Sequence, residues 1–300
     1  MMYTEFISSD GLIRDGAKSV KKLEILDEER PMGIQLYGHL IPSMVEATHR
    51  ALESGPEVID INFGCPVRKI AHRGAGAGML ANIPLMLEMT RAIVDASTVP
   101  VTVKTRLGWD EHQKIIAEIA EPLQDQGISA LTIHGRTRSQ MYKGRADWFL
   151  IGEVKKNPRI LIPIIGNGDI TSPMEAANAF KMYGVDGIMI GRAAVGKPWI
   201  FGHIRQYLQT GELLPEPTIS EKVEMAKLQF TKSLESKGEP VGIYEMRRHF
   251  SNYFKGIPHF KETRLKLLTT LDVEEIFRLL DQIRDRHGDF RPRVEGGFWD

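Results

Sequence analysis

The chain has 300 residues, 42% of them hydrophobic, and its 39 basic residues balance 39 acidic ones. This composition suits one large domain plus a small one, and the neutral balance excludes a protein coated in basic charge while allowing a local basic face. A single cysteine excludes an intramolecular disulfide and a cysteine-rich zinc site. No apolar run approaches the length of a membrane span and no signal-peptide pattern opens the chain, so we expect a cytoplasmic protein with no membrane contact.

Short apolar runs alternate with helical stretches from Met1 to about Arg205, a pattern typical of βαβ units. The runs predict seven strands, at residues 2–7, 33–37, 58–63, 99–104, 130–134, 162–165 and 187–190. Helices are predicted between the strands from their start and stop signals. Pro42, Asn82, Asp110 and Ser172 mark helix starts, and Gly55, Gly127 and Gly184 mark the ends of the first, third and fourth of these helices. The alternation favours a TIM (β/α)8-type barrel, which needs eight strands. We therefore expect the first strand and helix to lie upstream of Met1, unless seven strands close differently.

The character of the sequence changes after Leu208. Residues 211–217 contain two prolines and read as a linker, and helices are predicted to begin at Ser220, Pro240 and Asp272 and to end near Ser236, Phe254 and His287. We predict a barrel domain over residues 1–210, a linker over 211–217, a small all-helical domain over 218–290 and a loosely ordered tail over 291–300.

The only cysteine lies in the stretch Val58-Ile59-Asp60-Ile61-Asn62-Phe63-Gly64-Cys65-Pro66. Gly64 and Pro66 end the predicted strand and leave the thiol on the turn beyond it. In parallel barrels, the carboxyl ends of the strands carry the chemistry, so Cys65 is a candidate catalytic residue. The alternative is that Cys65 is a small buried hydrophobic residue, as most free cysteines are.

Polar residues follow five predicted strands at equivalent positions: Gln35, Lys104, His134, Asn167-Gly168-Asp169 and Gly191-Arg192. Each alone has a structural explanation, such as a lysine that reaches solvent, but five together indicate a site. Glycine-rich turns after the last two strands commonly hold a phosphate, and Arg192 would add a cation. A lysine at the end of a buried strand needs a partner that is or becomes negative, and Gln35 could bind the polar edge of a ring. FMN meets both requirements.

The residues also resemble a known family, the tRNA-dihydrouridine synthases, over nearly the whole length through Phe290. The string from Asp60 to Pro66 is similar to the family's active-site signature. Two further strings, at residues 3–12 and 74–78, look most like the bacterial synthase B branch. The relatives begin with a strand and a helix that precede the segment at Tyr3, which agrees with the count of seven strands.

The resemblance implies an FMN enzyme that uses NADPH to reduce a uridine of tRNA to 5,6-dihydrouridine. Cys65 would give a proton to uracil C5 while flavin N5 delivers a hydride to C6, and Asn62 would help to place the uracil. The matching flavin positions are Gln35, Lys104, His134, Asn167, Gly168, Asp169, Gly191 and Arg192.

Basic residues gather in three stretches and are predicted to contact tRNA phosphates. They are Arg68, Lys69, His72 and Arg73 after the cysteine, Arg136, Arg138, Lys143 and Arg145 after His134, and Arg247, Arg248, Lys255, Lys261, Arg264 and Lys266 in the helical domain. Interleaved aromatics, Phe250, Tyr253, Phe254 and Phe260, are predicted to pack in the helical core. A solvated charged face is the alternative for the basic residues. We expect a monomer.

Two other functions remain open at this stage. One is an FMN barrel that dehydrogenates a small, dihydroorotate-like substrate, which would not explain the basic helical domain. The other is a catalytically inactive, flavin-free relative that still binds tRNA. A metal-dependent hydrolase is disfavoured, because no His-x-His or carboxylate cluster has ligand spacing, and we predict no metal.

Overall fold

The computed structural model describes residues 1–292, so residues 293–300 of the predicted tail lie outside the described part. The chain forms two compact units. The first comprises residues 1–169 and 178–189, and the second comprises residues 170–177 and 190–300. The predicted linker at 211–217 thus falls within the second unit, which also takes in residues 190–210.

The first unit is built on one sheet of parallel strands in the order β1-β3-β4-β5-β6-β7-β8, with β2 also pairing with β3. The strands are β1 (Met2–Tyr3), β2 (Ile7–Ser8), β3 (Met32–Tyr37), β4 (Val58–Asn62), β5 (Val101–Arg106), β6 (Ala130–His134), β7 (Ile164–Asn167) and β8 (Gly187–Met189). The central strands bury both faces, which is why they read as continuous apolar runs in the sequence.

The first predicted strand is interrupted, because β1 and β2 pair with the two halves of β3. At the break, Thr4 donates its backbone N–H to the Gly33 carbonyl at 2.9 Å, and its hydroxyl oxygen accepts the Gln35 backbone N–H at 3.1 Å. The sheet therefore has seven strand positions, as predicted. Within residues 1–292, β1 and β8 are the outer strands and do not pair with each other.

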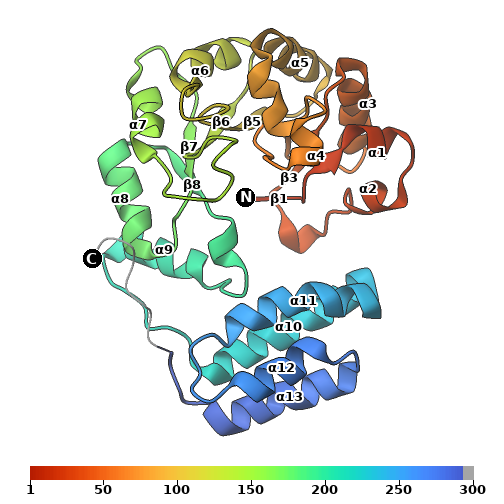
Figure 1. The fold of residues 1–300 in the computed structure, drawn as a ribbon, viewed down its shortest axis with the longest axis vertical. Coiled ribbons are helices and arrows are strands. Elements are labelled where there is room, and N and C mark those ends of the chain that lie inside the picture. The colour runs from red at the N-terminus through yellow and green to blue at the C-terminus, as the bar shows by residue number, and fades with distance from the viewer. Residues whose placement is uncertain (293–300) are drawn as a thin grey trace. The chain divides into compact units, whose positions relative to one another are not determined.

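Helices follow the strands and lie around the outside of the curved sheet (Figure 1). The longer ones are α3 (Ile41–Leu52), α5 (Ile83–Ala96), α6 (Ile116–Asp125), α7 (Trp148–Lys156) and α8 (Pro173–Tyr183). The shorter ones are α1 (Ser9–Ile13), α2 (Ala17–Lys21), α4 (Arg68–Ala71) and the 3-10 turns η1 (Asp27–Glu29) and η2 (Gly76–Ala81). Asn82 caps α5 as predicted, since its Oδ1 accepts the Leu85 N–H at 3.3 Å. The α/β barrel-type fold class is confirmed.

The second unit is helical and contains η3 (Arg192–Ala194), α9 (Ile200–Thr210), α10 (Ile219–Lys237), α11 (Glu239–Tyr253), α12 (Lys261–Thr269) and α13 (Val273–His287). Asp272 caps α13 as predicted. The prediction that Ser220 caps α10 is wrong: Thr218 does, because Thr218 and Glu221 form a reciprocal capping box. None of the helices in residues 1–292 combines the length and apolar character needed to cross a membrane.

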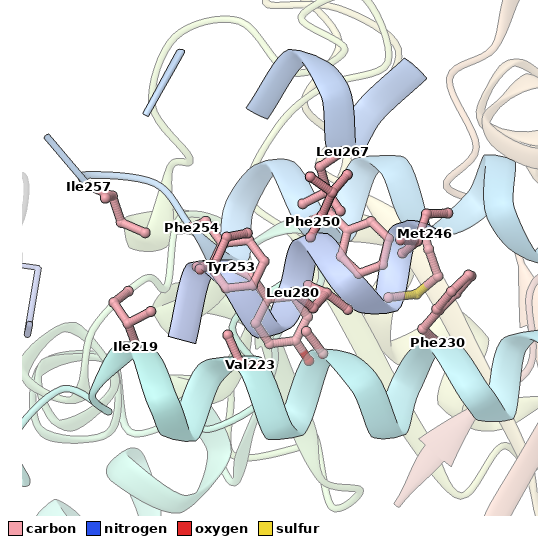
Figure 2. Close-up of a cluster of buried hydrophobic side chains, with 14 of the residues drawn as sticks. Ile219, Val223, Phe230, Met246, Phe250, Tyr253, Phe254, Ile257, Leu267 and Leu280 are labelled. Atoms are coloured by element: carbon pink, nitrogen blue, oxygen red, sulfur yellow. The ribbon is translucent and has the colours of Figure 1, made fainter. Parts of the chain in front are cut away.

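Aliphatic and aromatic side chains fill the core between these helices (Figure 2). Phe230 of α10 packs edge-on against Phe250 of α11, with ring centroids 5.6 Å apart. Tyr253, Phe254 and Phe260 belong to the same cluster. The prediction that the aromatics between the basic residues form the helical core is confirmed. The neighbouring cations are exposed, except for the half-buried Arg247.

Candidate active site at the carboxyl ends of the strands

The turn after β4 holds Cys65 almost out of solvent, at 6% exposure. The Asn62 side chain folds this turn, because its Oδ1 accepts the backbone N–H groups of Gly64 at 3.0 Å and Cys65 at 2.9 Å. The Cys65 carbonyl accepts the Ala77 backbone N–H at 3.0 Å. Burial raises the pKa of the Cys65 thiol. The thiol therefore keeps its proton near neutral pH and can donate it.

A chain of buried hydrogen bonds leads from β5 through β4 and β3 to this turn. The Asp60 carboxylate accepts the Thr102 hydroxyl at 2.5 Å and the Gln35 amide Nε2 at 2.6 Å. Gln35 Oε1 then accepts Asn62 Nδ2 at 2.6 Å. Burial raises the pKa of Asp60 to about 6, against the opposing effect of the hydrogen bonds from Thr102 and Gln35. Gln35, a predicted cofactor contact, is thus held in a defined orientation.

Lys104 lies on β5 in register with Asn62 of β4, so its side chain starts beside the cysteine turn. Burial, and then the charge of Arg106, lower the pKa of Lys104 to about 8. An ammonium group in this setting gains stability from any negative group that binds next to it. That Lys104 serves a ligand rather than the solvent stays a prediction.

Arg106 is a residue of this site that sequence reasoning missed, because the predicted strand ended at Lys104 whereas β5 continues for two more residues. Its side chain is 2% exposed, and its Nε donates to the Gly64 carbonyl at 2.7 Å. Its Nη1 donates at 2.8 Å to two carbonyls of the loop after β6, those of Thr137 and Met141. A signal was available, since polar residues at 102, 104 and 106 repeat with the period of a strand.

The loop over residues 135–147 is fastened by an ion pair at the ends of β6 and β7. Arg136, 2% exposed, donates through Nη2 to both Asp169 oxygens at 2.8 and 2.7 Å. Asp169 Oδ2 also accepts the Ala146 backbone N–H at 2.8 Å, and Arg136 Nη1 lies 3.4 Å from Nε2 of the buried His134. Arg136 and Asp169 therefore hold this loop, and the tRNA and flavin contacts predicted for them stay predictions.

Asn167 ends β7 in register with His134 of β6, and Gly168 follows it. Asn167 Nδ2 donates to the Met189 carbonyl of β8 at 2.7 Å. Gly168 has φ +131°, and a Cβ there would lie 2.6 Å from the Ala146 Cβ. Only glycine fits this close approach. The strand register therefore brings the predicted residues of the first unit to one edge of the sheet.

The predicted tRNA contacts of the first unit differ in exposure. Arg68, Lys69, His72 and Arg73 are exposed on α4 and the segment after it, and so are Lys143 and Arg145 of the 135–147 loop. Arg138 is half-buried, and its guanidinium lies over the Trp109 ring, 4.6 Å from the ring centroid. The exposed residues offer cations to a large ligand, whereas Arg138 is partly occupied within the fold.

The remaining predicted residues belong to the second unit. Gly191 and Arg192 are exposed and follow β8 in the chain, where η3 begins. Lys255 is exposed after the end of α11. Arg247 is half-buried: its guanidinium lies 4.7 Å from the Tyr244 ring centroid, and its Nη2 donates to the Thr269 carbonyl at 3.3 Å.

The donors at the sheet edge suit an organic ligand. Within residues 1–292, no group of three or more His, Cys, Asp or Glu side chains is placed to hold a metal ion. The edge instead presents an ammonium, an imidazole and amides, from Lys104, His134, Gln35 and Asn62. Such groups match a ring that carries carbonyl oxygens and develops negative charge, as a flavin does.

Comparisons with known proteins identify the family of this chain. The family model described as dihydrouridine synthase (Dus) matches residues 1–284. A probable tRNA-dihydrouridine synthase 1 of Synechocystis sp. is 39% identical over 282 residues, which are 94% of this chain and 78% of that protein. A tRNA-dihydrouridine synthase B of Pseudomonas putida is 38% identical over 275 residues, 91% of this chain and 81% of that protein.

Among solved structures, histamine dehydrogenase from Rhizobium sp. 4-9 matches with a TM-score of 0.52 at 12% identity, over 70% of this chain and 41% of that chain. At this identity the likeness concerns the fold alone. The family model and the curated relatives, by contrast, cover nearly the whole chain, and the resemblance predicted from the sequence is confirmed. The chain belongs to the dihydrouridine synthase family.

Proposed function

We propose that this chain reduces a uridine of tRNA to 5,6-dihydrouridine, with FMN as cofactor and NADPH as reductant. One observation carries the proposal: the only thiol of the chain is buried, is kept protonated by its surroundings, and lies on the turn after β4, next to Lys104 of β5. A protonated thiol suits the delivery of a proton to carbon. Membership of the family, and the printed names of the relatives, support the choice of tRNA as substrate.

Each predicted site residue would have a distinct role. Gln35, Lys104, His134, Asn167, Gly168 and Asp169 would hold the flavin ring, and Gly191 with Arg192 would hold its phosphate. Bound FMN, once reduced by NADPH, supplies a hydride for C6 of the uracil ring. Cys65 gives its proton to C5, and Asn62 helps to hold the uracil. Lys104 would stabilise negative charge on the ring beside it.

Exposed cations would hold the tRNA. Arg68, Lys69, Arg73, Lys143 and Arg145 are exposed in the first unit, and Lys255 in the second. Phosphate contacts of this kind fit a protein with zero net charge, because affinity depends on local cations rather than on total charge. The uridine would leave the base stack to meet a thiol that lies in a turn. A monomer in the cytoplasm stays our expectation.

The test is a reaction of the purified chain with unmodified tRNA, FMN and NADPH, followed by mass spectrometry of the nucleosides. We expect one uridine per tRNA to gain two hydrogen atoms, and no gain without NADPH. Failure of this reaction in a flavin-loaded protein would contradict the proposal.

The same preparation separates the two alternatives. An FMN dehydrogenase of a small substrate would oxidise or reduce dihydroorotate or orotate and ignore tRNA. A catalytically inactive relative would bind tRNA and take up no flavin. The basic residues around the second unit's aromatic core favour tRNA over the small substrate.

A further inference from the structure

The fully buried Asp60 has no part in the chemistry proposed above. It precedes Asn62 by two residues on β4, so both side chains leave the strand on the same side. We propose that Asp60 is the positioning residue of the cysteine turn: its carboxylate sets which way the Gln35 and Asn62 amides point, and so fixes the backbone around Cys65.

The direction of this series of hydrogen bonds follows from which side-chain atoms are donors and which are acceptors. An ionised carboxylate only accepts, so the NH2 end of Gln35 must face Asp60, as it does at 2.6 Å. Gln35 Oε1 is then left to face Asn62 and accepts its Nδ2 at 2.6 Å. Asn62 Oδ1 is in turn left to face the turn, where two backbone N–H groups need an acceptor. Every hydrogen bond in this series therefore depends on the Asp60 carboxylate, the acceptor at its start.

The same order decides what a ligand meets. With both amide oxygens engaged inside the chain, Gln35 and Asn62 can offer only N–H donors to a bound molecule. The carbonyl oxygens of uracil and of a flavin ring are acceptors. This consequence rests on the proposed function, whereas the effect of Asp60 on the cysteine turn does not.

Asp60 has a competing role as a counter-charge, because its charge opposes the lowering of the Lys104 pKa. Two substitutions separate the roles. Asp60→Asn keeps an acceptor for Gln35 and a group that can donate to the Thr102 oxygen, but it loses the charge. Asp60→Leu loses both the acceptor and the charge at a similar size. Positioning predicts that Asn substitutes for Asp60 and Leu does not; a counter-charge predicts that both fail alike.

The test is the rate at which the thiol reacts with 5,5′-dithiobis(2-nitrobenzoate) in the native protein, measured as purified with its flavin content recorded. The rate reports Cys65 alone, because the chain has no other cysteine. We expect Asp60→Leu to speed the reaction by about fivefold or more, the factor that one lost hydrogen bond gives, and Asp60→Asn to change it by less than about twofold. In a protein that already carries Asn62→Ala, which removes the hydrogen bonds to the turn, the further substitution Asp60→Leu should not raise the thiol rate again.

Asp186→Asn is the matched control. That carboxylate also supports the sheet, by accepting the Ile164 backbone N–H and the Lys155 ammonium, both within 2.8 Å, but it has no bond to the cysteine turn. Its substitution should leave the thiol rate at the parent value while lowering thermal stability. Equal rates in Asp60→Leu and the parent, or equal changes in Asp60→Leu and Asp60→Asn, would overturn the proposal.

Thermal unfolding shows whether Asp60→Leu is folded. If it is not, Gln35→Met breaks the same chain one step further along, and an unchanged thiol rate in that variant overturns the proposal equally. Uridine reduction is measured beside the thiol rate. A parent protein that makes no dihydrouridine contradicts the proposed function, and the thiol rates still decide the role of Asp60.

Discussion

The two units of the chain differ in what they bury beside their aliphatic side chains. The first buries a polar chain at the sheet edge, where Asp60, Gln35 and Asn62 bond to one another. The second buries aromatic rings, such as Phe230 and Phe250, among aliphatic side chains, and its basic residues between positions 247 and 266 are exposed or half-buried. A buried polar group is costly unless it is bonded or used, so the first pattern favours a site at the sheet edge, whereas the second is a packed core beneath a basic surface. The predictions below test this contrast.

Replacing Cys65 by Ala should have the largest effect. Removal of the proton donor should lower the rate of dihydrouridine formation by about 100-fold or more, within the range of general acid catalysis. The fold and the flavin content should not change, because the Asn62 bonds reach the backbone of the turn rather than the thiol. Nucleoside analysis gives the rate and absorbance gives the flavin content; undiminished turnover would remove the proposed role of the thiol.

Phe250→Ala should show that the second unit depends on its core. This side chain is 1% exposed and packs against Phe230, so its truncation should lower the free energy of unfolding by about 3–5 kcal/mol. Urea denaturation measures the loss. The exposed Lys255→Ala on the same unit is the control and should change stability little; an equal loss in both variants would contradict the contrast.

Lys104 should make stability depend on pH in the flavin-free protein. Because its pKa falls from 10.5 to about 8 on folding, the unfolded chain binds more protons between these pH values, and the free energy of unfolding rises with pH there. The Lys104→Met variant should lose this rise, which is on the order of 2 kcal/mol. Denaturation at pH 8 and pH 10 compares the two proteins, and an equal change in both would show that folding does not lower the pKa of Lys104.

Joint replacement of Arg247 and Lys255 by Ala should have the smallest effect, a weaker affinity for tRNA with a shallower dependence on salt. Lys255 is exposed, and Arg247 contacts the Tyr244 ring and the Thr269 carbonyl, so the joint variant removes two cations from this surface. Filter binding over a range of salt concentrations measures both quantities. Equal salt slopes for variant and parent would exclude this surface from the tRNA contact.

The sequence was most informative where strand periodicity and polarity coincide. Gln35, Lys104, His134 and Asn167 were predicted at strand ends, and the register places them along one edge. Arg106 was missed because its strand was ended two residues early at Lys104.

The partners of charged residues were not predictable from the sequence. Arg136 read as a surface cation, yet it pairs with Asp169, 33 residues away in the chain. The role of Asp60 could not be predicted from its motif, because its two hydrogen-bond donors come from two other strands. Such pairings depend on register and on the path of a loop, which composition and spacing do not fix. The cap of α10 was misplaced by two residues for a simpler reason: Thr218 and Ser220 are both good capping residues, and only the box with Glu221 decides between them.

The most direct test of the central claim is to follow the flavin absorbance of the purified protein through one cycle of reduction and reoxidation. We expect NADPH to bleach the absorbance of a bound flavin in the absence of oxygen, and unmodified tRNA then to restore it. Neither free orotate nor tRNA that already carries dihydrouridine should restore the absorbance. Restoration by tRNA would establish both the cofactor and the substrate in one experiment. A bleached flavin that tRNA leaves bleached, or that orotate restores, would contradict the proposed reduction of a tRNA uridine.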